Sequence, residues 1–153
     1  VPEITKSETM QQIRDLVKED PKAIWLVVDM AYPATNIPAM AGADCLNTTQ
    51  TYPQKTRWEM LNQEGECEDI YNRYCHIRAS LGSKTMLELV STDYVEVTLS
   101  PEDLKKLNIR YIVSTNDFDE KILTGITNIF TESGIEFQKY YEGTQLSIYR
   151  CVY

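Results

Sequence analysis

The feature that most constrains the fold is a continuous apolar run, AIWLVVDM, from Ala23 to Met30. Its length is that of a β-strand, and its hydrophobic residues do not alternate with polar ones. This pattern is typical of a central strand that is buried on both faces, and such a strand needs a covering layer on each side. The run therefore predicts a strand in the interior of a sheet.

A helix is expected before this strand. Thr5 and Glu8 form a capping-box pattern, and the residues that follow predict a helix ending near Pro21, because proline disfavours helix in the residue before it. The apolar positions at helical spacing are Met10, Ile13, Leu16 and Val17.

The second half of the chain alternates strands with helices. TMLELV and YVEVTLS read as two strands, and IRYIVST as a third. Ser100 followed by Pro101 indicates the start of a short helix, and a further helix over 122–130 is expected to begin at Asp119 and end at Gly134. Weaker patterns suggest short helices over 56–62 and 67–77.

The chain is expected to close with a hairpin, IEFQKYYEGTQLSIYRCVY, which turns near Gly143. Together the patterns predict an α/β fold with a mixed β-sheet flanked by helices and a C-terminal antiparallel hairpin. Residues 1–153 contain no repeat or linker, which predicts a single soluble domain.

The charge excludes some classes of partner. The net charge is −8, from 23 acidic and 15 basic residues, and no basic cluster stands out. Nucleic acid is therefore not an expected partner. The first twelve residues have no apolar core, and no stretch of about 18 apolar residues could form a membrane span.

A search for catalytic motifs finds almost nothing. The chain lacks the glycine-rich phosphate motifs, the serine-hydrolase elbow and the zinc-protease motif. His76 is the only histidine, so a metal centre is not expected, and neither is a catalytic residue or a cofactor. Four acids lie close together around Gly65 and offer an alternative, a pair of hydrolytic carboxylates: Glu64, Glu66, Glu68 and Asp69.

Four cysteines permit three disulfide pairings, and the sequence does not choose among them. They are Cys45, Cys67, Cys75 and Cys151. Cys67 and Cys75 are too far apart to pair on a continuous helix, and could pair only if the chain folds back between them.

The segment from Asn36 to Trp58 is unusual because Asp44 is its one acidic residue and Lys55 and Arg57 come only near its end. Its apolar residues predict an ordered, partly buried loop, with Ile37, Met40 and Leu46 among the anchors, and ordered long loops often carry function. Aromatic rings beside Asn, Gln and Thr suit stacking on sugars or packing against another protein, although the same rings can simply fix a loop to the core.

The candidate ligand-binding residues lie in and after this loop. Tyr or Trp would stack on a sugar ring, and Asn or Arg would bind its hydroxyls or a phosphate. The candidates are Asn47, Tyr52, Trp58, Asn72 and Arg73. Arg73 lies between two tyrosines, so it could instead be a structural cation on an aromatic face.

Several segments together resemble a known architecture: NIPAMAGADCLNTTQTYP, then YNRYCHI, then LKKLNIRYIVST, then YYEGTQLSIYRCV. This order is similar to the extracytoplasmic C-terminal domain of large multi-pass bacterial membrane proteins, the YfhO-like and related glycosyltransferase-like families. The resemblance covers nearly the whole chain, but its motifs are patterns of small and aromatic residues rather than an active-site signature.

The resemblance implies a location on the outer face of the bacterial cell membrane, as part of a membrane-embedded parent. It implies that the domain is non-catalytic and binds or positions a cell-surface glycan or lipid-linked sugar, or docks on the transmembrane region of its parent. The alternatives are a secreted carbohydrate-active hydrolase using the acids near Gly65, and a protein-interaction module using sheet edges.

Overall fold

The computed structural model describes residues 2–30, 36–46, 76–91, 94–115, 128–143 and 146–153. The helices are α1 (Pro2–Glu19), α2 (Ile37–Met40), α5 (Pro101–Leu107) and α7 (Asn128–Glu132). The strands are β1 (Ile24–Val27), β2 (Asp44–Cys45), β3 (His76–Leu81), β4 (Met86–Ser91), β5 (Tyr94–Leu99), β6 (Ile109–Thr115), β7 (Glu136–Glu142) and β8 (Leu146–Val152).

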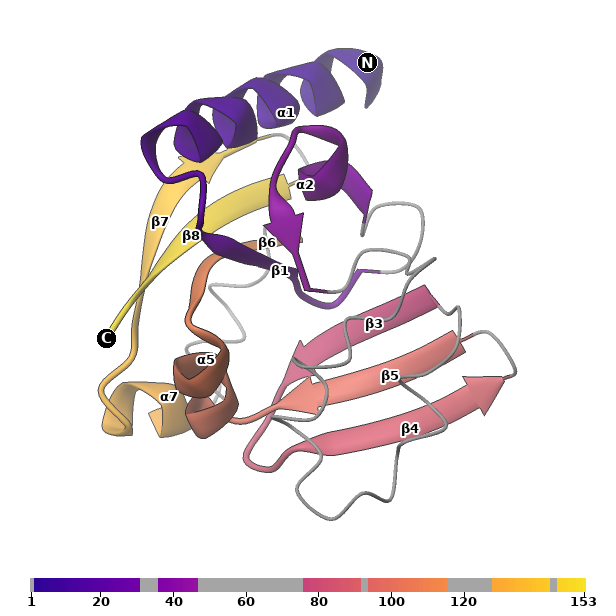
Figure 1. Ribbon diagram of the computed structural model, residues 1–153, viewed down its shortest axis with the longest axis vertical. Helices are drawn as coiled ribbons and strands as arrows, with labels where there is room; N and C mark the ends of the chain where they lie inside the picture. Colours follow the sequence, from indigo (N-terminus) through magenta and orange to yellow (C-terminus); the bar gives the residue numbers. More distant parts are fainter. Residues whose placement is uncertain (1, 31–35, 47–75, 92–93, 116–127, 144–145) are drawn as a thin grey trace.

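The strands form two sheets (Figure 1). A five-stranded sheet has the order β2-β1-β6-β8-β7, with β1 parallel to both neighbours and β6, β8 and β7 antiparallel in turn. This confirms the predicted α/β fold with a mixed sheet and a C-terminal antiparallel hairpin. A second sheet, β3-β5-β4, was not anticipated as a separate layer. The single-domain assignment over 1–153 stays a prediction.

Strand β1 is buried on both faces, as its apolar sequence predicted. Trp25 and Val27 point into one hydrophobic cluster, and Leu26 and Val28 point into another. All four side chains are almost completely buried. The strand therefore separates two cores, and each core needs its own covering layer.

Different elements cover the two faces of the five-stranded sheet (Figure 1). Helices α1 and α2 close the core that contains Trp25, through Ile13, Leu16 and Ile37. The three-stranded sheet, with α5 and α7, closes the other core. Besides Leu26 and Val28, this second core contains buried side chains from both sheets and from α5 and α7. They are Leu46, Ile77, Ala79, Val95, Val97, Leu99, Leu104, Leu107, Ile109, Ile112, Phe130, Ile135, Tyr149 and Cys151.

Helix α1 ends where the sequence predicted but begins earlier. Its last turn closes with the Asp20 amide donating to the Leu16 carbonyl at 2.9 Å, just before Pro21. The helix already includes Pro2, so the prediction that Thr5 caps its start is wrong. Proline fits the first helical turn, where its missing N–H has no partner to lose.

The predicted start of α5 is confirmed in detail. The Asp103 amide donates to the Ser100 hydroxyl at 3.3 Å, and the Asp103 carboxylate accepts from the Ser100 amide at 2.8 Å, which completes a capping box. The Thr85 hydroxyl, from the turn between β3 and β4, donates to the same carboxylate oxygen. Asp103 is buried, so this oxygen ties the second sheet to α5.

Helix α7 ends at Glu132, and Gly134 caps its C-terminal end, as predicted. This glycine has a φ of 85°, and the Ile135 amide donates to the Phe130 carbonyl at 2.9 Å. That pattern is the Schellman motif, in which a left-handed residue lets the chain satisfy the last carbonyls of a helix. The first part of the expected helix, including Asp119, lies outside the described residues.

The charge-poor segment from Asn36 to Trp58 is described by the structure only as far as Leu46. Ile37 and Leu46 are buried, as expected of anchors. Met40 is 66% exposed, so its predicted anchoring role is wrong; α2 is a single turn and buries Ile37 and Pro38 instead. Trp58, the last expected anchor, lies outside the described residues.

The short helix expected over 67–77 is wrong at its end, because His76 and Ile77 belong to β3. This strand pairs in parallel with β5 in register from His76 opposite Tyr94 to Leu81 opposite Leu99. Ile77 and Ala79 both point into the core, and this spacing of two residues is typical of a strand rather than a helix.

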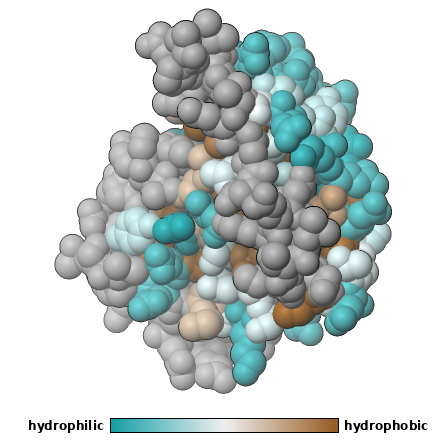
Figure 2. All heavy atoms as spheres, turned by 180° about the vertical axis from the view of Figure 1, so that it is seen from behind, coloured by the Kyte–Doolittle hydropathy of each residue, from teal (hydrophilic) through white to brown (hydrophobic). Residues whose placement is uncertain are grey.

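The coloured part of the surface is mainly hydrophilic when the molecule is viewed from behind, with hydrophobic residues in small separate areas (Figure 2). Within the described ranges, no helix has the length and apolarity needed to cross a membrane.

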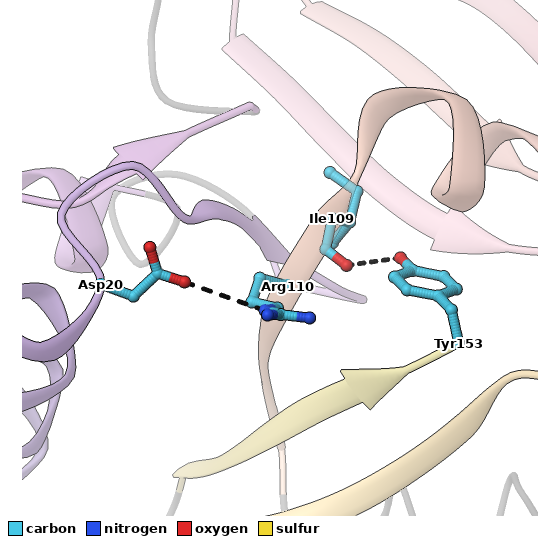
Figure 3. Close-up of polar contacts among 4 residues, drawn as sticks. All are labelled: Asp20, Ile109, Arg110 and Tyr153. Carbon is cyan, nitrogen blue, oxygen red and sulfur yellow. Dashed lines mark hydrogen bonds and ion pairs between the residues drawn. The ribbon is translucent and has the colours of Figure 1, made fainter.

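The Tyr153 side chain contacts the backbone where α5 leads into β6. The Tyr153 hydroxyl donates to the Ile109 carbonyl (Figure 3) and lies 3.0 Å from the Leu104 carbonyl. Burial, and to a lesser extent the neighbouring Cys151, raises the pKa of Tyr153. On the other side of β6, Arg110 lies 3.8 Å from Asp20, an exposed pair that contributes little to stability (Figure 3).

Cys45 and Cys151 are buried thiols and not half-cystines, whereas Cys67 and Cys75 lie outside the described residues. Burial raises the pKa of Cys151 to about 12, with a smaller opposing effect of Arg110. The thiol should therefore resist thiol-specific reagents in the folded protein, because the reactive species is the thiolate.

We expect this burial to make the fold less stable at alkaline pH. An unfolded cysteine loses its proton near pH 8.5 to 9, whereas folded Cys151 keeps it. The contribution of Cys151 to the free energy of unfolding is therefore fully present below that range and is lost as the pH rises toward 12. Between pH 9 and 10.5 the loss in the free energy of unfolding should be about 2 kcal/mol. Denaturant titrations at each pH would measure it, and Cys151→Ala should have a shallower dependence. Parallel curves for the two proteins would contradict the assignment.

Candidate functional site

The end of β1 is fixed between the two sheets. The Val28 amide donates to the Val113 carbonyl at 2.9 Å, and the Ser114 hydroxyl donates to the Val28 carbonyl at 2.9 Å. On the other side, Val28 forms a parallel bridge with Ala79 of β3. The carboxyl end of β1 is therefore the seam at which the second sheet joins the first.

Asp29 follows directly at this seam. Its amide donates to the Ala79 carbonyl at 2.8 Å, and its φ of 59° lies in the left-handed region. Asp is among the few residues that tolerate this conformation, in which the chain turns sharply out of a strand. The half-buried Asp29 side chain is held by backbone that is bonded on both sides.

The neighbouring strands present polar residues on one face of the second sheet. Ile77 and Ala79 of β3 point into the core, so Arg78 and Ser80 point the other way. On β5, Glu96 and Thr98 are the Cα partners of Arg78 and Ser80. The Ser80 and Thr98 hydroxyls lie 3.4 Å apart, within hydrogen-bonding distance.

These elements meet around a half-open depression of about 250 Å³. Among the residues that the structure describes, four line it, Asp29, Arg78, Ser80 and Glu96, and every one of these side chains can form hydrogen bonds. These four side chains, which include two carboxylates and one guanidinium, together carry one net negative charge. Within the described part of the chain, the side chains of Arg78 and Glu96 make no hydrogen bond or ion pair, so both can bind a ligand.

The lining suits a hydroxyl-rich ligand better than a metal ion. Among the residues that the structure describes, no group of three or more His, Cys, Asp or Glu side chains could hold a metal. The carboxylates accept hydrogen bonds, the guanidinium donates them in a fixed fork, and Ser80 can do either.

The ligand-binding residues predicted from the sequence all lie outside the described residues, so they stay predictions. They are Asn47, Tyr52, Trp58, Asn72 and Arg73. The acids around Gly65 lie outside as well. His76 contributes its backbone to the start of β3.

The four residues of the depression were not singled out from the sequence. Asp29 carried a signal, because it stands at the exit of the most apolar strand, where ligands of open α/β sheets bind. Arg78 and Ser80 alternate with Ile77 and Ala79, but the expected helix over 67–77 took in Ile77 and hid the start of this two-residue period. Glu96 lies in the predicted strand YVEVTLS, but nothing in that stretch indicates a binding role.

Comparison with known protein families assigns a family to nearly the whole chain. Residues 3–153 match a family described as Domain of unknown function (DUF7654). No curated protein and no solved structure matches the chain.

Proposed function

The chain belongs to the DUF7654 family, and we propose that it is a non-catalytic domain that binds a glycan in the depression at the carboxyl end of β1. The observation that carries the proposal is the lining itself. Asp29, Arg78, Ser80 and Glu96 supply both donors and acceptors, and they surround a volume that a ligand can enter from solvent.

The position of the depression supports binding. Ligands of open α/β sheets tend to sit outside the carboxyl ends of the parallel strands, because the chain leaves each strand there and polar loop residues gather. Asp29 occupies that place on β1, and the hydrogen bonds of Val28 on both sides hold it there.

The chemistry of the lining supports a sugar in particular. Neighbouring hydroxyls of a sugar ring can donate to a carboxylate and accept from a guanidinium at the same time. Arg78 and Glu96 are register partners on adjacent parallel strands, so their side chains lie side by side and can bind adjacent hydroxyls.

The proposal includes the setting that the sequence suggests. The domain would lie on the outer face of the bacterial cell membrane as part of a multi-pass, glycosyltransferase-like protein, and would position a cell-surface glycan or lipid-linked sugar for that protein. Docking on the transmembrane region of the parent would hold the depression near the substrate. The support for this setting is the resemblance of the sequence.

We expect Arg78→Gln to weaken glycan binding roughly tenfold or more, because a charged hydrogen-bond donor is lost. The melting temperature should change little, since the exposed Arg78 side chain has no partner within the described residues. Binding would be measured by calorimetry of the 153-residue chain with neutral oligosaccharides of glucose, mannose, galactose and N-acetylglucosamine.

Arg14→Gln is the matched control, because Arg14 is an exposed arginine on α1 outside the depression. Equal loss of affinity in both variants would argue against the site. Failure of the unmodified chain to bind any of these oligosaccharides would argue against glycan binding altogether. Turnover of an oligosaccharide, seen as new reducing ends, would favour the alternative of a hydrolase.

A further inference from the structure

We propose that Glu96 makes the depression selective for uncharged sugars over acidic ones. This inference rests on the proposed glycan binding and adds the class of sugar that is accepted. It starts from the position of Glu96 in the middle strand of the second sheet, where residues of both neighbouring strands lie beside it.

Glu96 has a charged register partner on each side. Arg78 of β3 is its Cα partner in the parallel pair, and Glu88 of β4 is its partner in the antiparallel pair. The row Arg78–Glu96–Glu88 therefore carries one net negative charge, and Asp29 adds a second one at the depression. The whole chain, at −8, has the same sign.

This arrangement disfavours anions at the position of Glu96. A lone arginine in a neutral surrounding would attract the carboxylate of a uronic acid or a phosphate through its two parallel donors. Here Glu96 lies next to Arg78, so an anion that approaches the guanidinium also approaches a carboxylate of like charge. Such like-charge contacts are a common means of rejecting a wrong ligand.

The same carboxylate favours an uncharged sugar. Glu96 makes no hydrogen bond or ion pair within the described part of the chain, and its two oxygens can accept from adjacent hydroxyls. The residue therefore acts in two ways: it binds hydroxyl donors and it repels acidic groups.

The test compares neutral oligosaccharides with oligomers of uronic acid, each titrated into the 153-residue chain and into Glu96→Gln. The neutral oligomers should bind roughly tenfold more weakly to the variant, because a charged acceptor becomes an amide. The uronic acid oligomers should bind several-fold more tightly, because the repulsion is gone. The preference for neutral sugars should therefore fall by more than tenfold.

Glu88→Gln is the matched control. It removes the same charge from the same row, but Glu88 does not line the depression. If Glu96 acts by direct contact, Glu88→Gln should leave the affinity for neutral oligomers unchanged. Raising the salt concentration should reduce the rejection of uronic acids by the unmodified chain, because added ions screen exposed charges.

The outcomes separate the two proposals. If the chain binds neutral oligomers and Glu96→Gln keeps the same preference, the role of Glu96 is overturned and glycan binding stands. If both glutamate variants shift the preference equally, overall charge is the cause and the inference is again overturned. If the unmodified chain binds neither class, both proposals fail.

Discussion

Replacing Trp25 by alanine should lower the free energy of unfolding by about 4 kcal/mol, as is usual for the loss of a large buried aromatic side chain. Trp25 has no exposed surface, and its ring stacks on Tyr111 of the adjacent strand with centroids 4.6 Å apart. The side chain fills the core beneath α1, so its removal leaves a cavity beside Ile13 and Leu16. Denaturant titration followed by far-UV circular dichroism would measure the change.

Trp25→Phe is the matched variant. The indole N–H is buried and has no hydrogen-bond partner within the described residues, so phenylalanine removes an unsatisfied donor and keeps a ring against Tyr111. We expect it to cost less than half as much as the alanine variant. If both variants cost the same, the stacked ring is not the source of the stabilisation.

Replacing Asp103 by alanine should lower the free energy of unfolding by about 3 kcal/mol. One oxygen of this buried carboxylate accepts from the Ser100 amide, the Ser100 hydroxyl at 2.9 Å and the Thr85 hydroxyl. Alanine would leave these donors without this acceptor and would break the capping box of α5, of which only the bond from the residue 103 amide to the Ser100 hydroxyl would remain. The cost should appear as a lower midpoint of unfolding with an unchanged dependence on denaturant.

Glu102→Ala is the control for Asp103, because Glu102 is exposed in the same first turn and shares only its favourable position in the helix dipole. It should cost about 0.5 kcal/mol or less. Asp103→Asn keeps one carbonyl oxygen, so we expect an intermediate loss. Equal losses in the variants of Glu102 and Asp103 would show that the buried oxygen is not the stabilising feature.

The parts of the fold that depend on short stretches of sequence could be predicted. The start of α5 follows from Ser100 and Asp103, which satisfy one another three residues apart. The end of α7 follows from Gly134, which adopts a positive φ at little cost. Strands β7 and β8 of the hairpin pair antiparallel and are separated by only three residues of sequence. In each case the interacting groups are close in sequence.

Local patterns misled where the deciding contact was distant. Thr5 and Glu8 have the spacing of a capping box, but spacing cannot show where a helix begins when Pro2 already fits its first turn. His76 and Ile77 lie at the end of a plausible helical pattern, but pairing with β5, 18 residues further on, makes them a strand. Met40 has an apolar side chain of the kind that can anchor a loop, but α2 is a single turn and does not bury it.

The sequence by itself determined that β1 is buried on both faces, because an uninterrupted apolar run has no polar face to offer to water. It also determined the α/β class, the start of α5 and the end of α1, and the helix ends among these depend on neighbouring residues. Only the tertiary structure decided that a second sheet covers one face, and that Asp29, Arg78 and Glu96 meet. That meeting depends on the bridge between Val28 and Ala79, a contact between distant parts of the chain that no periodicity encodes.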